Sequence, residues 1–172
     1  MDLGQKESAM GNNRMIREEL LQMVSDLSDE QLNERVQEGS WTIAEVLEHL
    51  HLTEKFVAEM MADVLVKEER RPAEEKPIHL VLDRSQKVEA PSLVAPSEVF
   101  KTLDEMKEKL LQSRQTLTKI VEAASPDDLQ QRSYPHPVFG RISLAQWIAV
   151  VGLHEKRHLE QIRELKEKLE NS

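Results

Sequence analysis

Two histidines near the end of the chain are spaced as metal ligands are on a helix. His154 and His158 are four residues apart, so on an α-helix their rings project from one face, with Cβ atoms about 6 Å apart. Two imidazoles on adjacent turns can bind one cation. Such a pair inside an apolar stripe also needs a shared partner, because burying an unsatisfied imidazole nitrogen is costly. The pair therefore indicates a divalent metal site.

His49 is the candidate for a third ligand. With about 100° of rotation per residue, it falls on the apolar face of its own predicted helix, toward one side. A lone histidine in such a place is more often a hydrogen-bonded core residue than a ligand. If it does meet His154 and His158, three neutral nitrogens would leave positions open for water or substrate, as in catalytic sites. Zinc, nickel, cobalt and ferrous iron all suit this donor set.

The other polar residues near these histidines are weaker candidates. Gln161 follows His158 by three residues and could hydrogen-bond a ligand imidazole or a bound water. His136 lies in an ordered loop and could line the pocket, whereas His51 and His79 are expected to face solvent. Glu45 is one turn before His49, and we interpret it as a helix-capping residue.

The elements that must position these residues are four long helices in one domain, residues 1–172. Apolar residues recur every three or four positions over residues 13–27, 42–64 and beyond, 97–124, and 143–169. Capping boxes are predicted for Ser28 with Gln31, Thr42 with Glu45, and Ser143 with Gln146. The pattern predicts an all-α, antiparallel four-helix bundle, with about twelve flexible residues before the first helix.

Aromatic side chains and prolines refine this picture. Trp41 and Trp147 are predicted core anchors, and Phe100 is expected on the apolar face of the third helix. Residues 71–96 contain four prolines and form a long crossover between helices two and three, expected to pass over one end of the bundle and to roof a site. Residues 134–140 should be extended, because each proline disfavours helix in the residue before it.

The composition excludes several classes of function. The 172-residue chain has no cysteine, so disulfides, thiolate metal sites and cysteine nucleophiles are excluded. A net charge of −9, with no basic patch, disfavours nucleic-acid and membrane partners. We find no signal peptide and no apolar stretch of transmembrane length, and therefore expect a cytoplasmic protein that acts on a small molecule.

Three segments resemble the DinB/YfiT-like superfamily in order and spacing. They are Trp-Thr-Ile-Ala-Glu-Val-Leu-Glu-His-Leu at 41–50, His-Pro-Val-Phe-Gly at 136–140, and His-Glu-Lys-Arg-His-Leu-Glu-Gln-Ile at 154–162. The last is the most specific. The resemblance implies an up-down-down-up bundle, frequently a homodimer. It also implies nickel or zinc held by one histidine of helix two and two of helix four, here His49, His154 and His158.

The same resemblance implies a thiol-dependent activity, since the family includes bacillithiol S-transferases and a mycothiol-dependent maleylpyruvate isomerase. Our leading hypothesis is a metal-dependent transferase that activates a low-molecular-weight thiol against a small electrophile, with Gln161 or His136 orienting nucleophile or substrate. The alternatives are a metal-dependent hydrolase, or a metal-binding dimeric stress-response module without turnover.

Overall fold

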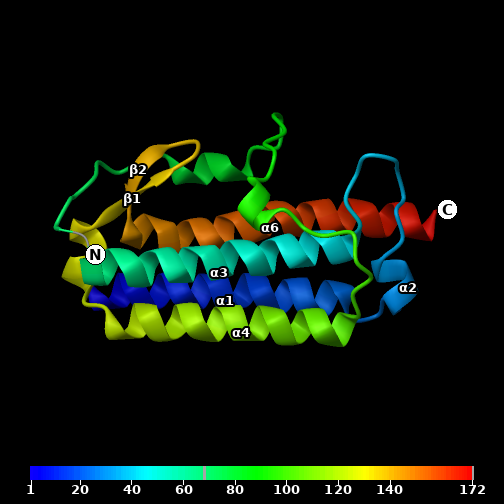
Figure 1. The fold of residues 1–172 in the computed structure, drawn as a ribbon, viewed down its shortest axis with the longest axis horizontal. Coiled ribbons are helices and arrows are strands. Elements are labelled where there is room, and N and C mark those ends of the chain that lie inside the picture. The colour runs from blue at the N-terminus through cyan, green and yellow to red at the C-terminus, as the bar shows by residue number, and fades with distance from the viewer. Residues whose placement is uncertain (68, 172) are drawn as a thin grey trace.

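Four long helices form the body of the protein in the computed structural model, which describes residues 1–67 and 69–171. These are α1 (Leu3–Val24), α3 (Ile43–Lys67), α4 (Leu103–Ala123) and α6 (Leu144–Glu170). Figure 1 shows α1 and α6 running in one direction and α3 and α4 in the other. The predicted all-α, up-down-down-up four-helix bundle is confirmed.

Short elements join the long helices. The turn after α1 contains α2 (Asp29–Leu32), and α4 leads through α5 (Pro126–Gln131) into a hairpin of β1 (Ser133–His136) and β2 (Gly140–Ser143). The hairpin is antiparallel and pairs Ser133 with Ser143. The prediction of an extended segment is confirmed for residues 134–136 and 140, whereas residues 137–139 form the turn. The turn closes at Gly140, whose φ of 69° suits glycine.

The capping boxes explain where several helices begin. Those predicted for Ser28 with Gln31 and for Thr42 with Glu45 are present in full. At α6 only half of the predicted box forms. Ser143 accepts from the backbone N–H of Gln146, but the Gln146 side chain bonds both the N–H and the carbonyl of Lys76. Gln146 therefore ties the long crossover to α6 instead of closing its own cap.

The first helix begins earlier than predicted. Asp2 and Gln5 form a capping box that starts α1 at Leu3 rather than near Asn13. Lys6 is buried, and its ammonium donates to the carbonyls of Glu122 and Ala124 at the C-terminal end of α4. The residues expected to be flexible are thus helical. Their helix is held in place because Lys6, a residue type typical of the surface, caps the end of α4.

The third long helix, α4, begins later than predicted. Thr102 caps α4 together with Glu105, so residues 97–101 lie outside the helix and Phe100 is 55% exposed rather than on the apolar face. Lys101 holds this loop, because its ammonium pairs with Glu48 and donates to the carbonyls of Ser97 and Val99.

The crossover between α3 and α4 lies along the side of α6 rather than over an end of the bundle (Figure 1). Its turns η1 (Ile78–Leu82) and η2 (Ser92–Val94) contact α6 and α3, respectively. Arg157 of α6 holds it by donating to the carbonyls of Val81, Asp83 and Gln86. The described helices contain no segment apolar and long enough to cross a membrane.

Candidate metal centre

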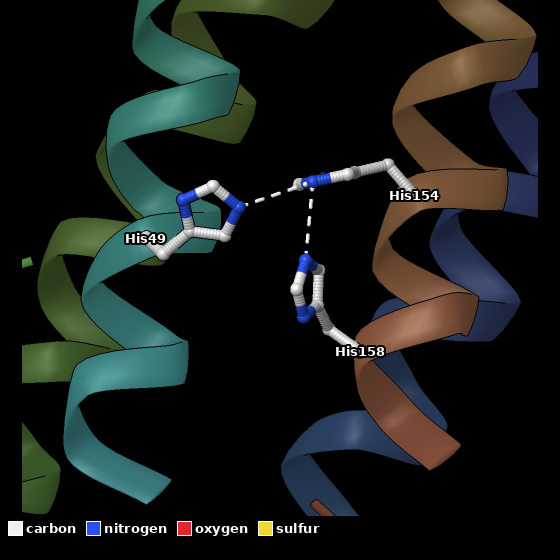
Figure 2. Close-up of side chains that lie close together, drawn as sticks. All are labelled: His49, His154 and His158. Atoms are coloured by element: carbon white, nitrogen blue, oxygen red, sulfur yellow. Dashed lines mark hydrogen bonds between the residues drawn. The ribbon is translucent and has the colours of Figure 1, made fainter. Parts of the chain in front are cut away.

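Three histidine rings meet between α3 and α6 (Figure 2). His49 comes from α3, and His154 and His158 come from successive turns of α6. The Nε2 atom of His154 lies 3.1 Å from that of His49 and 3.2 Å from that of His158, and one nitrogen from each ring lies within 4.8 Å of the others. The structure thus brings together the three histidines that the sequence singles out, at a spacing that one ion could span.

Hydrogen bonds on the far side of two rings fix which nitrogen is protonated. His49 Nδ1 is 2.8 Å from the carbonyl oxygen of Val94, and His158 Nδ1 is 2.7 Å from Oε1 of Gln161. A carbonyl oxygen only accepts, so each Nδ1 carries the proton. The neutral rings therefore present bare Nε2 lone pairs toward His154.

This arrangement fits a cation better than it fits a hydrogen-bonded cluster. A neutral His154 ring can donate one N–H to one of its two neighbours, which leaves lone pairs facing each other at the other contact. A divalent ion can accept a lone pair from all three nitrogens at once. The hydrogen bonds of His49 and His158 at Nδ1 already impose the tautomers that this requires. The donor set thus fits zinc, nickel or a similar ion.

Burial keeps the three imidazoles neutral. It lowers the pKa of His49, lowers that of His154 well below the usual value, and lowers the pKa of His158 to about 4. Nearby positive charge, including that of Arg157, adds to the effect at His154 and His158. At neutral pH the rings therefore need not lose a proton before they act as nitrogen donors.

The two tryptophans occupy different environments. Trp147 is 5% exposed and donates from Nε1 to the carbonyl of Tyr134, which confirms it as a core anchor. Trp41 is only partly buried: its ring centroid lies 5.0 Å from that of His49 and 6.3 Å from that of His158, stacked on the latter. Trp41 is therefore also a wall of the histidine cluster.

His136 and Gln161, the other candidate site residues, have distinct positions. Gln161 contacts His158 directly, as described above. His136 Nδ1 accepts from the N–H groups of Val138 and Phe139, so this ring shapes the hairpin turn. The ring also packs 5.1 Å from Trp147 and is close enough to influence the pKa of His154.

The remaining candidates lie away from the cluster. Glu45 closes its capping box and pairs with Arg35 at 2.9 Å, as expected for a cap. His79 is exposed, also as expected. His51 does not join the cluster, but the prediction that it faces solvent is wrong. Its ring is half-buried, and burial lowers its pKa.

Sequence reasoning missed an ionic network in the bundle core. Arg17 of α1 and Arg114 of α4 both bind Glu54 of α3 and Glu155 of α6, at N–O distances between 2.6 and 3.2 Å. Ser113 adds a hydroxyl donor to Glu54 at 2.7 Å. Glu155 directly follows His154, and its place inside the apolar periodicity of α6 was the available signal. The network joins all four long helices at the level of the histidine cluster.

Relatives in sequence cover most of the chain. Residues 14–162 match the model of the DinB superfamily. The protein YuaE of Bacillus subtilis is 39% identical over 150 residues, which are 85% of this chain and 90% of YuaE. A protein of Oceanobacillus iheyensis named "Putative metal-dependent hydrolase OB0782" is 28% identical over 142 residues, 83% of this chain and 74% of that protein.

Solved structures show the same fold. TT2238, a four-helix bundle protein, superposes with a TM-score of 0.64 at 21% identity, over 92% of this chain and 98% of its own. YfiT from Bacillus subtilis, described as a probable metal-dependent hydrolase with an unusual four-helix bundle topology, gives 0.67 at 18% identity, over 98% and 90%. The match over residues 14–162, together with the similarity to YuaE, shows that this chain belongs to the DinB superfamily.

Proposed function

We propose that this protein binds one divalent cation through the Nε2 atoms of His49, His154 and His158 and uses it in catalysis. The observation that carries the proposal is the orientation of two imidazole lone pairs. The Nδ1 protons of His49 and His158 are donated to Val94 and Gln161, so the Nε2 atoms of both rings face His154 without a proton. The name of one sequence relative describes a metal-dependent hydrolase, which supports the same conclusion. Zinc or nickel suits the site best, as three neutral nitrogens favour borderline ions.

The three-histidine set leaves coordination positions free, which distinguishes catalytic from structural sites. A cation held there would act as a Lewis acid and lower the pKa of a bound thiol or water. The thiol or water would then lose its proton near neutral pH. The chain's own contribution is to hold the three rings neutral and correctly oriented. Gln161 and the Val94 carbonyl do this from outside the cluster. We further propose that His136, whose Nδ1 is used in the hairpin turn, offers Nε2 to a substrate near His154.

Thiol transfer to a small electrophile is the reaction we propose first. The chain has no cysteine, so a thiol nucleophile must arrive as a cosubstrate and cannot come from the protein. Trp41 beside His49 and His158 supplies a flat apolar wall for an organic group. Hydrolysis is the second candidate, and the names of a sequence relative and of a structural neighbour favour it.

One set of assays separates these reactions. Protein loaded with zinc, nickel or cobalt would be given a chloronitroarene with mercaptoethanol or cysteamine, and separately a nitrophenyl ester without thiol. Thiol-dependent arylation that is lost in His154→Ala supports the transferase, and ester cleavage lost in the same variant supports the hydrolase. Metal uptake with neither activity indicates a binding module. Failure of the wild-type protein to retain any of the three ions overturns the proposal.

A further inference from the structure

One buried hydroxyl of α3 has no hydrogen-bond partner in the part of the chain that the structure describes. Among the described residues, two buried side-chain polar atoms lack a hydrogen bond, His51 Nδ1 and Thr53 Oγ1. A threonine in a helix ordinarily satisfies its hydroxyl with the carbonyl four residues earlier. Thr116 of α4 does this, with Oγ1 3.0 Å from the carbonyl of Gln112. Thr53 makes no such bond, although a buried unsatisfied hydroxyl destabilises the fold.

The helical position of Thr53 places it beside the cluster. It follows His49 by one turn of α3, with an offset of about 40° around the helix axis, so both residues lie on the side that faces α6. His51 is about 200° from His49 and lies on another side. The hydroxyl of Thr53 and the ring of His49 are therefore directed to the same interface.

The ionic network fixes the level of Thr53 along that interface. Glu54 and Glu155 both bind the guanidinium of Arg114, at 2.6 and 3.0 Å, and both bind Arg17. On two antiparallel helices the residue before each glutamate is displaced from this common height in opposite directions, so these two residues lie about 3 Å apart along the interface. Those residues are Thr53 and His154, whose Nε2 is the central nitrogen of the cluster.

We infer that the Thr53 hydroxyl binds the small-molecule nucleophile, a thiol or a water, by a hydrogen bond to its sulfur or oxygen atom beside His154. The inference rests on the proposed metal site. It adds a residue, Thr53, that selects and positions the thiol or water that reaches this site. A hydroxyl suits this role because it donates to an anionic ligand and accepts from a protonated one. The bound nucleophile would in turn satisfy the hydroxyl, which no group of residues 1–67 and 69–171 does.

The test uses the full chain loaded with cobalt, whose visible spectrum reports on the atoms around the ion. Mercaptoethanol is titrated into wild type, Thr53→Val, Thr53→Ser and Thr116→Val. Valine keeps the shape of threonine and removes the hydroxyl, serine keeps the hydroxyl, and Thr116 is an exposed helical control whose hydroxyl has a partner.

We expect Thr53→Val to bind cobalt as wild type does but to bind mercaptoethanol about tenfold more weakly, the effect of one hydrogen bond to a charged group. Thr53→Ser and Thr116→Val should stay within about twofold of wild type. Thr53→Val should also melt at the same temperature or higher, since it removes an unsatisfied buried hydroxyl; a hydroxyl with a purely structural role would give a lower value.

Three outcomes would contradict the inference in different ways. Equal thiol affinity in wild type and Thr53→Val overturns the role of Thr53 and leaves the metal site standing. A wild type that binds cobalt but shows no spectral response to the thiol also overturns that role alone. A wild type that takes up no cobalt overturns the metal site, and the inference with it.

Discussion

The imidazole of His49 donates from Nδ1 to the backbone carbonyl of Val94, at 2.8 Å. Val94 belongs to the crossover between α3 and α4, so a segment remote in sequence fixes the tautomer of a candidate ligand. The bond turns the Nε2 lone pair toward His154 and His158. The crossover is thereby part of the site, even though it supplies no histidine to the cluster.

The first prediction compares two histidines of α3. His49→Ala should abolish retention of zinc at about one ion per chain, because two nitrogens do not hold the ion against buffer. His154→Ala and His158→Ala should behave in the same way. His51→Ala should retain zinc, since its ring lies outside the cluster. Each variant would be dialysed against trace zinc and analysed for bound metal; equal loss in His49→Ala and His51→Ala would refute the ligand assignment.

Local sequence patterns predicted the bundle and the pair of His154 and His158, whereas the assignment of His49 as the third member also rested on the resemblance to the DinB/YfiT-like superfamily. His154 and His158 needed only a four-residue spacing within an apolar stripe, and His49 needed the rotation of its own helix. The bounds of α3 and α6 followed because capping residues and apolar periodicity agree there. Where these signals conflict, as at Ser97 and Thr102, the pattern predicts a helix start that is too early.

The features that could not be predicted all depend on contacts between distant segments. Gln146 reads as a capping residue and instead bonds the backbone of Lys76. Lys6 reads as a surface residue and instead caps α4. The bond from His49 to Val94 requires the path of the crossover, which a proline-rich segment does not reveal. A pattern of side chains specifies faces, whereas these bonds require the relative placement of elements.

The second prediction concerns the pH dependence of the metal-free protein. The pKa of His158 falls from 6.5 to about 4 on folding, so between these values the unfolded chain binds more protons than the native one. The neutral His158 ring therefore contributes to stability above about pH 6.5, and this contribution is lost as the pH falls toward 4. A shift of this size corresponds to about 3 kcal/mol.

Thermal melts in chelator across this range test the second prediction. Wild type should lose stability steadily as the pH is lowered, and His158→Gln should show a flatter dependence, because its side chain does not titrate. His79→Gln is the matched control, since His79 is exposed on η1 and its replacement should leave the wild-type slope. A pH dependence in His158→Gln that is as steep as in wild type, or steeper, would contradict the assignment.

The third prediction concerns the residue that orients His158. Gln161→Leu removes the acceptor of the His158 Nδ1 proton and should weaken zinc binding by about 10- to 100-fold without changing the number of ions bound at saturation. Gln161→Glu keeps an acceptor and should bind zinc at least as tightly as wild type. Competition with a chromophoric chelator gives the affinities. Gln112→Leu, on the exposed face of α4, is the control, and an unaltered affinity in Gln161→Leu would exclude the orienting role.

The fourth prediction concerns the ionic network. Arg17→Met should lower the free energy of unfolding by about 3–5 kcal/mol, because it leaves the carboxylates of Glu54 and Glu155 buried with only Arg114 to compensate them. The surface variant Arg163→Met, which breaks an exposed contact with Glu19 at 3.4 Å, should cost no more than about 1 kcal/mol. Urea denaturation of the two variants makes the comparison.

A double variant separates the buried charge from the loss of packing around Arg17. Glu155→Gln removes the negative charge that Arg17→Met leaves in excess, so the combined variant should be more stable than the sum of the two single changes predicts. Since Arg17 contacts Glu155 through Nε at 2.6 Å, the coupling between them should be at least about 1 kcal/mol. Strict additivity, or an Arg17→Met protein as stable as Arg163→Met, would mean that the four charges do not act as a unit.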